Sequence, residues 1–423
     1  MSAAPPGQAL LLPIFVLTYV GIAATRVPFL RIDRPAVALV GAVALVLTGL
    51  ISLAEAFAFV NWNVIAFLLG MMVMVAYLEI AGFFTAAARF LLATSRTPQR
   101  LLWSTLGGCA LLSAFFVNDT ICLLLTPILV RATRAAGLPP LPFLIAIATS
   151  SNIGSALTVT GNPQNMLIGI DSRIPFATFS AAMAVPVLGA LGLDGLLISL
   201  VWRRALAPRP LAAGLVPAET FDRVLCAKAL LALAVTFVLF VVEFEFYPQA
   251  ALIGASLCLS TGRVPARDVW RRVDWSLLLF FAGLFVVMGG FQRAGYLDDL
   301  MASVRPFLAD DGGRGHGLGT FLALSGLAAL LSNLVSNVPA VVLLEPLVRD
   351  LGSGRGLWLC LALSSTLAGN FTLIASVANL IVAEKAAADG ERLPFFSYLA
   401  IGLPISLVTV ALGTAWVWAT TGS

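Results

Sequence analysis

Charged side chains are scarce in this sequence. Only 11% of its 423 residues are Asp, Glu, Lys or Arg, whereas 60% are hydrophobic. A soluble domain carries about 25% charged residues, and several apolar runs here approach the roughly 20 residues that cross a bilayer. The composition therefore excludes an ordinary soluble protein. It predicts a multi-pass protein embedded in the lipid bilayer.

Residues that commonly bind metals or perform covalent catalysis are also rare. The chain has one histidine, His316, and five cysteines that form no CxxC pair and lie in or beside apolar segments. The HExxH and GxGD motifs are absent, and so is a Ser–His pair. We therefore expect no metal site, no cofactor and no enzymatic activity.

Basic residues are sparse at the start of the chain. The first one, Arg26, follows the first apolar run, which argues against a cleaved signal peptide. The net charge of +4 comes with arginines in short segments between apolar runs, the pattern that sets membrane orientation. We therefore expect no nucleic-acid partner.

The apolar runs divide the chain into two similar halves, 1–202 and 228–423, joined by a basic linker at 203–227. The spans predicted in the first half are 9–25, 35–53, 61–81, 141–170 and 177–202, with a polar-tipped segment at about 100–134. Those predicted in the second half are 228–246, 249–261, 275–293, 356–384 and 396–420, with a polar-tipped segment at about 317–351.

Short sequence matches indicate that the second half is a duplicate of the first. Residues 60–63 (VNWN) match 273–276 (VDWS). Asn118 in the first polar-tipped segment pairs with Asn337 in the second. Further matches in the same order are Gly70 with Gly283, Pro127 with Pro346, Gly154 with Gly369, Thr158 with Thr372 and Asn165 with Asn379. Ordered blocks of this kind are typical of an internal repeat.

Each polar-tipped segment has two apolar arms that are too short to cross a bilayer. We predict two re-entrant helical hairpins, each entering and leaving by one membrane face. Five spans plus a hairpin give an odd number of crossings, so the second repeat is inverted. With the 26–34 loop in the cytoplasm, most of the 25 basic residues fall on the cytoplasmic side. The linker is then cytoplasmic, while both termini and the 296–316 connection lie on the outer side of the cell (inner) membrane.

Polar residues and helix breakers concentrate in matching places, at the hairpin tips and in one broken helix per repeat, about 141–170 and 356–384. Such groups are costly in a membrane unless they are satisfied, and paired breaks are typical of a transporter's binding site. The alternative is that the amides only join helices together. The candidate substrate-binding residues are Asn118, Thr120, Asn152, Ser155, Thr158, Asn162, Asn165, Ser336, Asn337, Asn370, Thr372, Ser376 and Asn379.

Asp119 is the only carboxylate among these tips and breaks, and its repeat counterpart is Val338. An ionisable residue at membrane depth is a functional candidate, so we assign Asp119 to proton or ion coupling. The alternative is a structural carboxylate that caps the helix beginning at Thr120. We expect Glu79 and Glu345 nearer the membrane faces. Because neither cluster contains Lys or Arg, a neutral polyhydroxy solute fits this lining better than an anion.

Several of these motifs resemble the ion transporter superfamily in its arsenite-pump and silicon-efflux branch. They are 118–120 (NDT), 138–140 (LPP), 151–155 (SNIGS), 161–165 (GNPQN), 274–276 (DWS), 332–339 (SNLVSNVP) and 368–373 (AGNFTL). The resemblance covers about 35–415 and is closest to the plant-type silicon-efflux transporters. One departure is Ala375, where related sequences tend to have glycine.

This resemblance implies a proton-driven efflux antiporter of small metalloid hydroxides or oxyanions such as silicic acid and arsenite. It also implies scaffold and transport domains, alternating access and, often, a homodimer. A carboxylate or inorganic anion carrier driven by sodium or protons is the alternative, with Na⁺ in place of H⁺ as the other candidate coupling ion.

Overall fold

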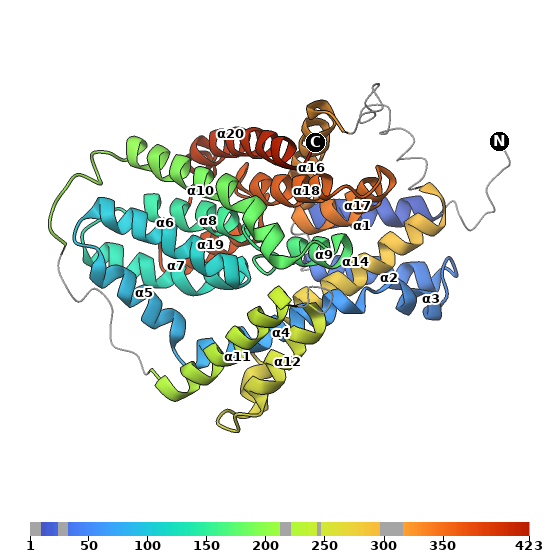
Figure 1. Cartoon of the computed structure of the whole chain (residues 1–423), viewed down its shortest axis with the longest axis horizontal. Helices are drawn as coiled ribbons and strands as arrows, with labels where there is room; N and C mark the ends of the chain where they lie inside the picture. Colours follow the sequence, from blue (N-terminus) through green and yellow to red (C-terminus); the bar gives the residue numbers. More distant parts are fainter. Residues whose placement is uncertain (1–9, 24–32, 212–220, 243–246, 297–315, 423) are drawn as a thin grey trace.

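The computed structural model describes residues 10–23, 33–211, 221–242, 247–296 and 316–422. Within those ranges the regular structure is helical, and no strand is present, as Figure 1 shows. The predicted all-α class is therefore confirmed. Most of the 296–316 connection and the middle of the 203–227 linker fall outside the described residues, so their sidedness stays a prediction.

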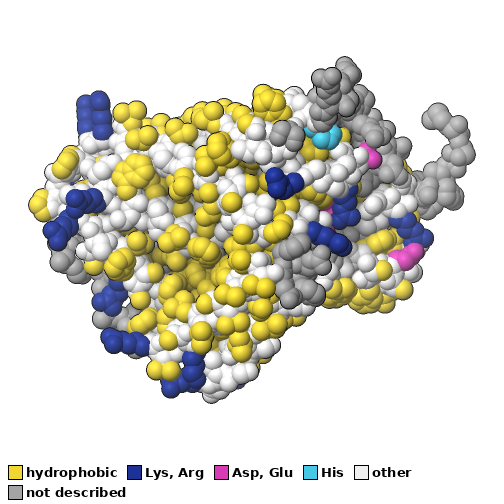
Figure 2. All heavy atoms as spheres, viewed as in Figure 1, with side chains coloured by type: hydrophobic (Ala, Val, Ile, Leu, Met, Phe, Trp, Pro, Cys, Tyr) yellow, Lys and Arg dark blue, Asp and Glu magenta, His cyan; other side chains and the backbone are white. Residues whose placement is uncertain are grey.

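Six helices of the described chain are long and apolar enough to cross a membrane. They are α4 (Trp62–Ile80), α10 (Phe176–Val201), α11 (Arg223–Val242), α14 (Trp275–Arg293), α16 (Leu318–Val335) and α20 (Phe395–Thr421). Large apolar side chains lie on the outside, such as Leu47 at 81% exposure and Phe396 at 80%. Figure 2 shows hydrophobic side chains over most of one face. This surface suits contact with lipid, so the protein is a multi-pass membrane protein.

Among the described residues, every helix of the first half except α5 has a counterpart at the same place in the order of the second half. The first half adds α1 (Leu11–Ala23), α2 (Arg34–Leu47), α3 (Leu53–Phe59), α5 (Phe83–Thr94), α6 (Pro98–Phe115), α7 (Asn118–Ala135), α8 (Leu141–Ser155) and α9 (Pro163–Ser172). The second half adds α12 (Tyr247–Leu259), α13 (Ala266–Trp270), α17 (Asn337–Asp350), α18 (Arg355–Leu367), the 3-10 turn η3 (Ala368–Asn370) and α19 (Val377–Ala388). Helix α5 occupies a stretch to which the sequence analysis assigned no element.

Two helix pairs interlock the halves. A Cβ atom at Gly70 of α4 would lie 2.6 Å from the backbone of Ala251 in α12. At the matching position, a Cβ at Gly283 of α14 would lie 2.8 Å from the backbone of Ala38 in α2. Only glycine permits these approaches. Each half therefore packs one long helix against the second helix of the other half, and Figure 1 shows the two pairs, α4 with α12 and α14 with α2, below and beside the hairpins.

The two polar-tipped segments are pairs of helices joined at a sharp turn. In the first, α6 and α7 meet at residues 116–117, and the backbone N–H of Asn118 donates to the carbonyl of Gly161 at 3.0 Å. In the second, α16 and α17 meet at Ser336, whose φ of 79° and ψ of 161° lie in a region that non-glycine residues rarely adopt. Each tip is thus held in a fixed geometry. Entry of both arms from one membrane face remains a prediction.

The breaks follow from local sequence. Helix α8 ends at Ser155, and the chain resumes as α9 with Pro163 in its first turn. The side chain of Asn162 caps α9 by accepting from the backbone N–H of Asn165 at 2.8 Å. In the second half, α18 passes into η3, and α19 begins after Ser376. Both interruptions place polar side chains and free helix ends in the interior of the molecule.

Candidate functional site

Asn152, in the last turn of α8, lies at the centre of a polar network. Its Nδ2 donates to Oδ1 of Asn370 at 2.8 Å and to Oδ1 of Asn379 at 3.0 Å. Its Oδ1 accepts from Nδ2 of Asn118 at 3.1 Å and from Oγ of Ser376 at 3.0 Å. One side chain therefore joins the hairpin tip of its own half to the broken helix of the other half.

Asn165 and Asn379 hold the two breaks with the same bonds. Each Nδ2 donates to two backbone carbonyls, ten and seven residues earlier in the chain. For Asn165 these belong to Ser155 (3.2 Å) and Thr158 (3.0 Å), and for Asn379 to Gly369 (2.8 Å) and Thr372 (3.2 Å). Carbonyls at the end of a helix lack helical partners. Both asparagines are fully buried, so their amide groups stabilise the breaks.

Thr366 makes the reciprocal contact from the second half. It precedes Asn379 by the same spacing that separates Asn152 from Asn165. Its Oγ1 accepts from Nδ2 of Asn162 and from Nε2 of Gln164, both at 3.3 Å, and lies 3.4 Å from Oδ1 of Asn165. The first part of each broken helix therefore contacts the second part of the other broken helix. Thr366 and Gln164 were not among the site residues predicted from the sequence.

The remaining hydroxyl groups bond within the same layer. The hydroxyl of Ser155 donates to the carbonyl of Asn152 at 2.9 Å, and that of Thr158 donates to the carbonyl of Ala114. The hydroxyl of Thr372 lies 3.4 Å from Oδ1 of Asn333. We call the bonded set the polar frame. Its members among the predicted site residues are Asn152, Ser155, Thr158, Asn162, Asn165, Asn370, Thr372 and Asn379.

In front of the frame, the two hairpin tips line one cavity of about 600 Å³. We call it the inner cavity, because its mouth is formed by segments that the charge pattern predicts to be cytoplasmic. The predicted site residues that line it are Asn118, Asp119, Ser336, Asn337 and Ser376. Thr120 is not among the described lining residues. Asn337 is 7% exposed, and its Oδ1 is buried and has no hydrogen-bond partner in the described structure.

The glycine in the second break allows one tip to approach the frame. A Cβ atom at Gly369 would lie 3.0 Å from Nδ2 of Asn337 and 3.3 Å from Cβ of Ser376. Either contact is tighter than almost all real Cβ contacts. Glycine at this position therefore brings the α17 tip into contact with the break.

Arg34 corrects the expectation that the site lacks a basic side chain. It starts α2 and lines the inner cavity beside Asp119, with which it interacts electrostatically. Its Nη1 donates to Oγ of Ser336 at 3.3 Å. The residue lies far from both polar clusters in the sequence. Only the packing of α2 against the second half brings it to the tips.

The described lining of the inner cavity is acidic. Its carboxylates are Asp33, Asp119, Asp274 and Glu384, and its only basic residue is Arg34. Four negative groups and one positive group give a net charge of −3 when all are ionised. Of this set, Asp119 alone was predicted from the sequence as a site residue. The others lie at helix ends that meet at the mouth of the cavity.

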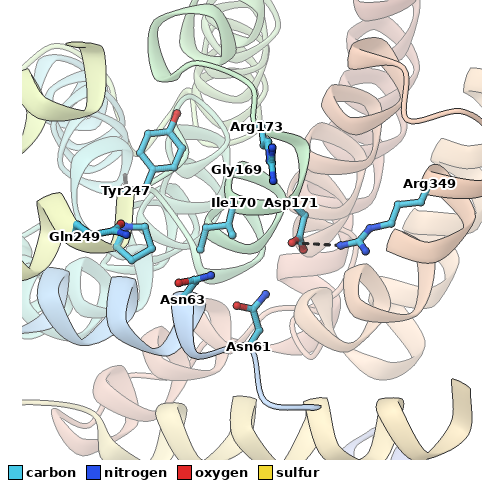
Figure 3. A pocket seen from close by; sticks show the side chains of 10 residues that line it. Asn61, Asn63, Gly169, Ile170, Asp171, Arg173, Tyr247, Gln249 and Arg349 are labelled. Atoms are coloured by element: carbon cyan, nitrogen blue, oxygen red, sulfur yellow. Dashed lines mark ion pairs between the residues drawn. The ribbon is translucent and has the colours of Figure 1, made fainter. Parts of the chain in front are cut away.

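A second pocket of about 460 Å³ lies on the opposite side of the frame, and we call it the outer pocket. Figure 3 shows Asn61, Asn63 and Gln249 pointing into it from α4 and α12, opposite Asp171 and Arg349. The carboxylate of Asp171 lies 3.3 Å from Nη2 of Arg349. None of the described residues that line this pocket comes from a hairpin tip.

Glu79 and Glu345 lie away from the tips, as expected. Glu79 is partly exposed and pairs with Arg272 at 3.2 Å. Glu345 forms an ion pair with Arg349 next to the outer pocket. Neither carboxylate lines the inner cavity, which leaves Asp119 as the carboxylate at a hairpin tip.

Comparison with known sequences gives consistent results along the chain. A family model described as citrate transporter matches residues 19–359. The silicon efflux transporter LSI3 of Oryza sativa subsp. japonica is 31% identical, with 92% of this chain and 93% of that protein aligned. A relative in Dictyostelium discoideum that bears the name transporter arsB is 26% identical over 95% of this chain and 90% of its own.

Comparison with solved structures supports the fold. The YdaH transporter of Alcanivorax borkumensis, described as having an unusual topology, superposes with a TM-score of 0.59. The match covers 99% of each chain at 15% sequence identity. At this identity the likeness concerns the fold alone.

Proposed function

Because this chain belongs to the citrate transporter family of the ion transporter superfamily, we propose that it is a proton-coupled efflux antiporter of small metalloid hydroxides. That it is a transporter follows from the family. The solute, the coupling ion and the direction of transport are the proposal. The relatives named silicon efflux transporter and transporter arsB support this solute class over others in the family.

The observation that carries the proposal is the composition of the inner cavity. Both hairpin tips line it with the amide groups of Asn118 and Asn337, and Ser376 from the second break adds a hydroxyl group. Such groups can donate to and accept from the hydroxyls of an uncharged solute such as silicic acid. The buried side-chain oxygen of Asn337 has no partner in the described structure. The cavity has room for about 20 waters at roughly 30 Å³ each, so a small solute enters with part of its hydration shell.

Charge distinguishes the leading function from its alternative. The inner cavity has a net charge of −3 when all its described groups are ionised. A citrate or succinate anion that enters the inner cavity is repelled, because its charge has the same sign as the net charge of the lining. A neutral hydroxide is not repelled. The alternative, a carboxylate carrier, is favoured by the family description and by Arg34, whose guanidinium can bind a carboxylate.

We assign proton coupling to Asp119. Its carboxylate lies at the α7 tip, inside the cavity, and faces the electrostatic influence of Arg34. Arg34 stabilises the ionised form, whereas burial favours the neutral form. The position of Arg34 relative to Asp119 therefore influences how readily this carboxyl group exchanges a proton. A solute that displaces Arg34 would change that balance, which couples binding to protonation.

The test is transport by the purified protein in proteoliposomes. Vesicles are given a pH gradient, a sodium gradient or neither, and accumulation of germanic acid, arsenite and succinate is measured. We expect accumulation of germanic acid or arsenite on the pH gradient, with no response to sodium. Succinate accumulation driven by sodium would instead establish the carboxylate carrier. Counterflow without a gradient controls for active protein in every sample.

A further inference from the structure

Asp194 is a second carboxyl group in the interior of the described chain. It lies in α10, seven residues before the end of the helix, and its side chain is completely buried. Oδ2 lies 2.6 Å from Oγ1 of Thr149 in α8. Oδ1 has no hydrogen-bond partner among the described residues. The proposed transport mechanism makes no use of this group.

No positive charge compensates Asp194 in the described structure. The helices that pack most closely on α10 are α6, α8, α11, α18 and α20. Helix α8 contains no charged or titratable residue, and α20 contains only Tyr398. The basic residues on the other three helices are Arg100, Arg223, Lys228 and Arg355, all of which are exposed, and each of those helices also has one neutral cysteine. None of these groups forms an ion pair with Asp194. An ionised carboxylate in such a site would be strongly destabilised.

The hydrogen count at Thr149 points to the neutral form. Its Oγ1 lies 2.9 Å from the carbonyl oxygen of Ile145 and 2.6 Å from Oδ2 of Asp194. Neither acceptor carries a hydrogen of its own when Asp194 is ionised, and a hydroxyl has one hydrogen to donate. Two separate hydrogen bonds at these distances need a second hydrogen, which a protonated Asp194 supplies by donating to Thr149, whereas an ionised Asp194 leaves one hydrogen shared between two acceptors.

This carboxyl group is connected to the polar frame. The backbone carbonyl of Thr149 accepts from Nδ2 of Asn370 at 3.1 Å. The Oδ1 of Asn370 accepts from Nδ2 of Asn152 at 2.8 Å and lies 3.4 Å from the hydroxyl of Tyr398. A change at Asp194 therefore reaches Asn152, which contacts residues of the inner cavity, through two side chains.

We propose that Asp194 is a proton-binding site distinct from Asp119, occupied in this conformation and emptied during the transport cycle. When the proton leaves for solvent, the carboxylate keeps both electrons of the O–H bond. Thr149 then turns its hydrogen from Ile145 to Asp194, and the α8 segment that supports Asn370 loses one interaction. The inference that Asp194 holds a proton in this conformation rests on the geometry alone. Its emptying rests on the proposed proton coupling.

Infrared spectroscopy of the reconstituted protein at neutral pH tests the bound proton. We expect a carbonyl band of a protonated carboxylic acid that Asp194→Asn removes and Asp119→Asn leaves in place. Thr149→Val retains Asp194 but removes its hydrogen-bond partner, so the band should shift to higher frequency. Since this variant changes only one hydroxyl to a methyl group, it keeps the test decisive even if Asp194→Asn fails to fold. A spectrum with no such band, or a band that both variants leave unchanged, would overturn the proposal.

Transport tests the emptying of the site. Asp194→Asn has the shape of the protonated acid and cannot release a proton. We expect its accumulation of solute on a pH gradient to fall at least tenfold, while counterflow stays within twofold of wild type. Accumulation equal to wild type would show that Asp194 keeps its proton throughout. A wild-type protein that ignores the pH gradient would count against the proposed function, and the infrared result would still decide whether Asp194 is protonated.

Discussion

The inner cavity and the outer pocket are built from equivalent parts of the two halves, yet they differ in depth. Arg34 and Pro35 begin α2 at the inner cavity, and Tyr247 and Pro248 begin α12 at the outer pocket. Asp274 and Ser276 at the start of α14 likewise correspond to Asn61 and Asn63 at the start of α4. The inner cavity reaches both hairpin tips, whereas the outer pocket reaches neither among its described lining residues. In this conformation, only one of the two equivalent surfaces therefore opens onto the hairpin tips.

The contacts around the outer pocket explain why this pocket does not reach the hairpin tips. The hydroxyl of Tyr247 donates to the carbonyl of Ile174 at 3.0 Å, which joins α12 to the segment after α9. Arg349 joins α17 to Asp171 at the end of α9. At the inner side, the equivalent of Tyr247 is Arg34, which contacts only the tip residue Ser336 among the described hydrogen bonds. A transporter that alternates between faces needs such an exchange of open and closed contacts.

The two spaces also differ in charge. The described lining of the inner cavity sums to −3, whereas Asp171, Arg173 and Arg349 give the outer pocket a net charge of +1. A neutral solute experiences neither field strongly. Protons are attracted to the inner cavity and repelled by the outer pocket, so the two spaces favour different protonation states of a carboxyl group that is exposed to each in turn.

Labelling from each side of the membrane tests the difference between the inner cavity and the outer pocket, and the expected result is all or none. Asn63→Cys and Ser276→Cys place a thiol at equivalent exposed positions of the two spaces. We expect an impermeant thiol reagent to modify Asn63→Cys only from outside and Ser276→Cys only from the cytoplasm. The five native cysteines are buried, so background reaction is low. Modification of both positions from one side would end the inverted-repeat interpretation.

Asp119→Asn should have the largest effect on transport. The amide keeps the size and most hydrogen bonds of the carboxyl group but cannot exchange a proton. We expect accumulation on a pH gradient to disappear, while counterflow survives. Glu79→Gln is the matched control, because it neutralises a partly exposed carboxylate that lines neither the inner cavity nor the outer pocket and should retain gradient-driven accumulation. If Asp119→Asn still concentrates solute, the coupling residue lies elsewhere.

Arg34 and Tyr247 are equivalent positions with different contacts, and their variants should differ. Arg34→Gln removes a charged hydrogen bond to Ser336 and the positive charge beside Asp119. Hydrogen bonds to charged groups contribute about 1.5–3 kcal/mol, so transport rates should fall about 10- to 100-fold. Tyr247→Phe removes one neutral bond to Ile174, and its rates should fall less than tenfold. Initial rates in proteoliposomes measure both, and equal losses would contradict a special role for Arg34.

Asn165→Leu and Asn379→Leu should have matching effects, because the two amides make matching bonds. Each variant leaves two carbonyls of the break without their donor, and a buried carbonyl without a partner costs about 1–3 kcal/mol. We expect lower thermal stability of the purified protein, to a similar extent in both variants, together with loss of transport. Asn63→Leu, at an exposed position, is the control and should leave stability unchanged. A large effect of one variant and none of the other would show that the two breaks are not equivalent in energy.

The sequence predicted the helical class, the hairpin tips and the breaks because each depends on local features. Hydrophobic runs, Gly-Asn-Pro strings and repeated Asn positions are all visible along the chain. It did not predict which polar residues line the inner cavity and which form the polar frame, because Asn165 and Asn337 are the same residue type in similar apolar surroundings. Nor did it predict Arg34 or Asp194, each of which lies outside the polar clusters and meets them only through helix packing.

The smallest predicted effect concerns a single charge at the mouth of the inner cavity. Asp274 caps α14 by accepting from the N–H of Leu277 at 3.0 Å, and its equivalent Asn61 caps α4 by accepting from Val64 at 3.3 Å. Asp274→Asn therefore preserves the cap, since Asn and Asp cap helices about equally well, and removes one negative charge. A charge about 8 Å from a solute in a watery space contributes roughly 0.5 kcal/mol. Succinate carries two negative charges, so the difference is about 1 kcal/mol, and the preference for germanic acid over succinate should fall about fivefold.

Salt and the reverse substitution sharpen this last test. The change should vanish at high ionic strength, where a charge is screened within a few ångströms. Asn61→Asp, which adds a negative charge at the equivalent outer position, should leave the preference measured from the cytoplasmic side unchanged. Competition between the two solutes at low and high salt measures both variants. If Asp274→Asn shifts the preference equally at both salt concentrations, the residue acts through contact with the solute or through the fold of α14, and the acidic field of the inner cavity is not what selects the solute.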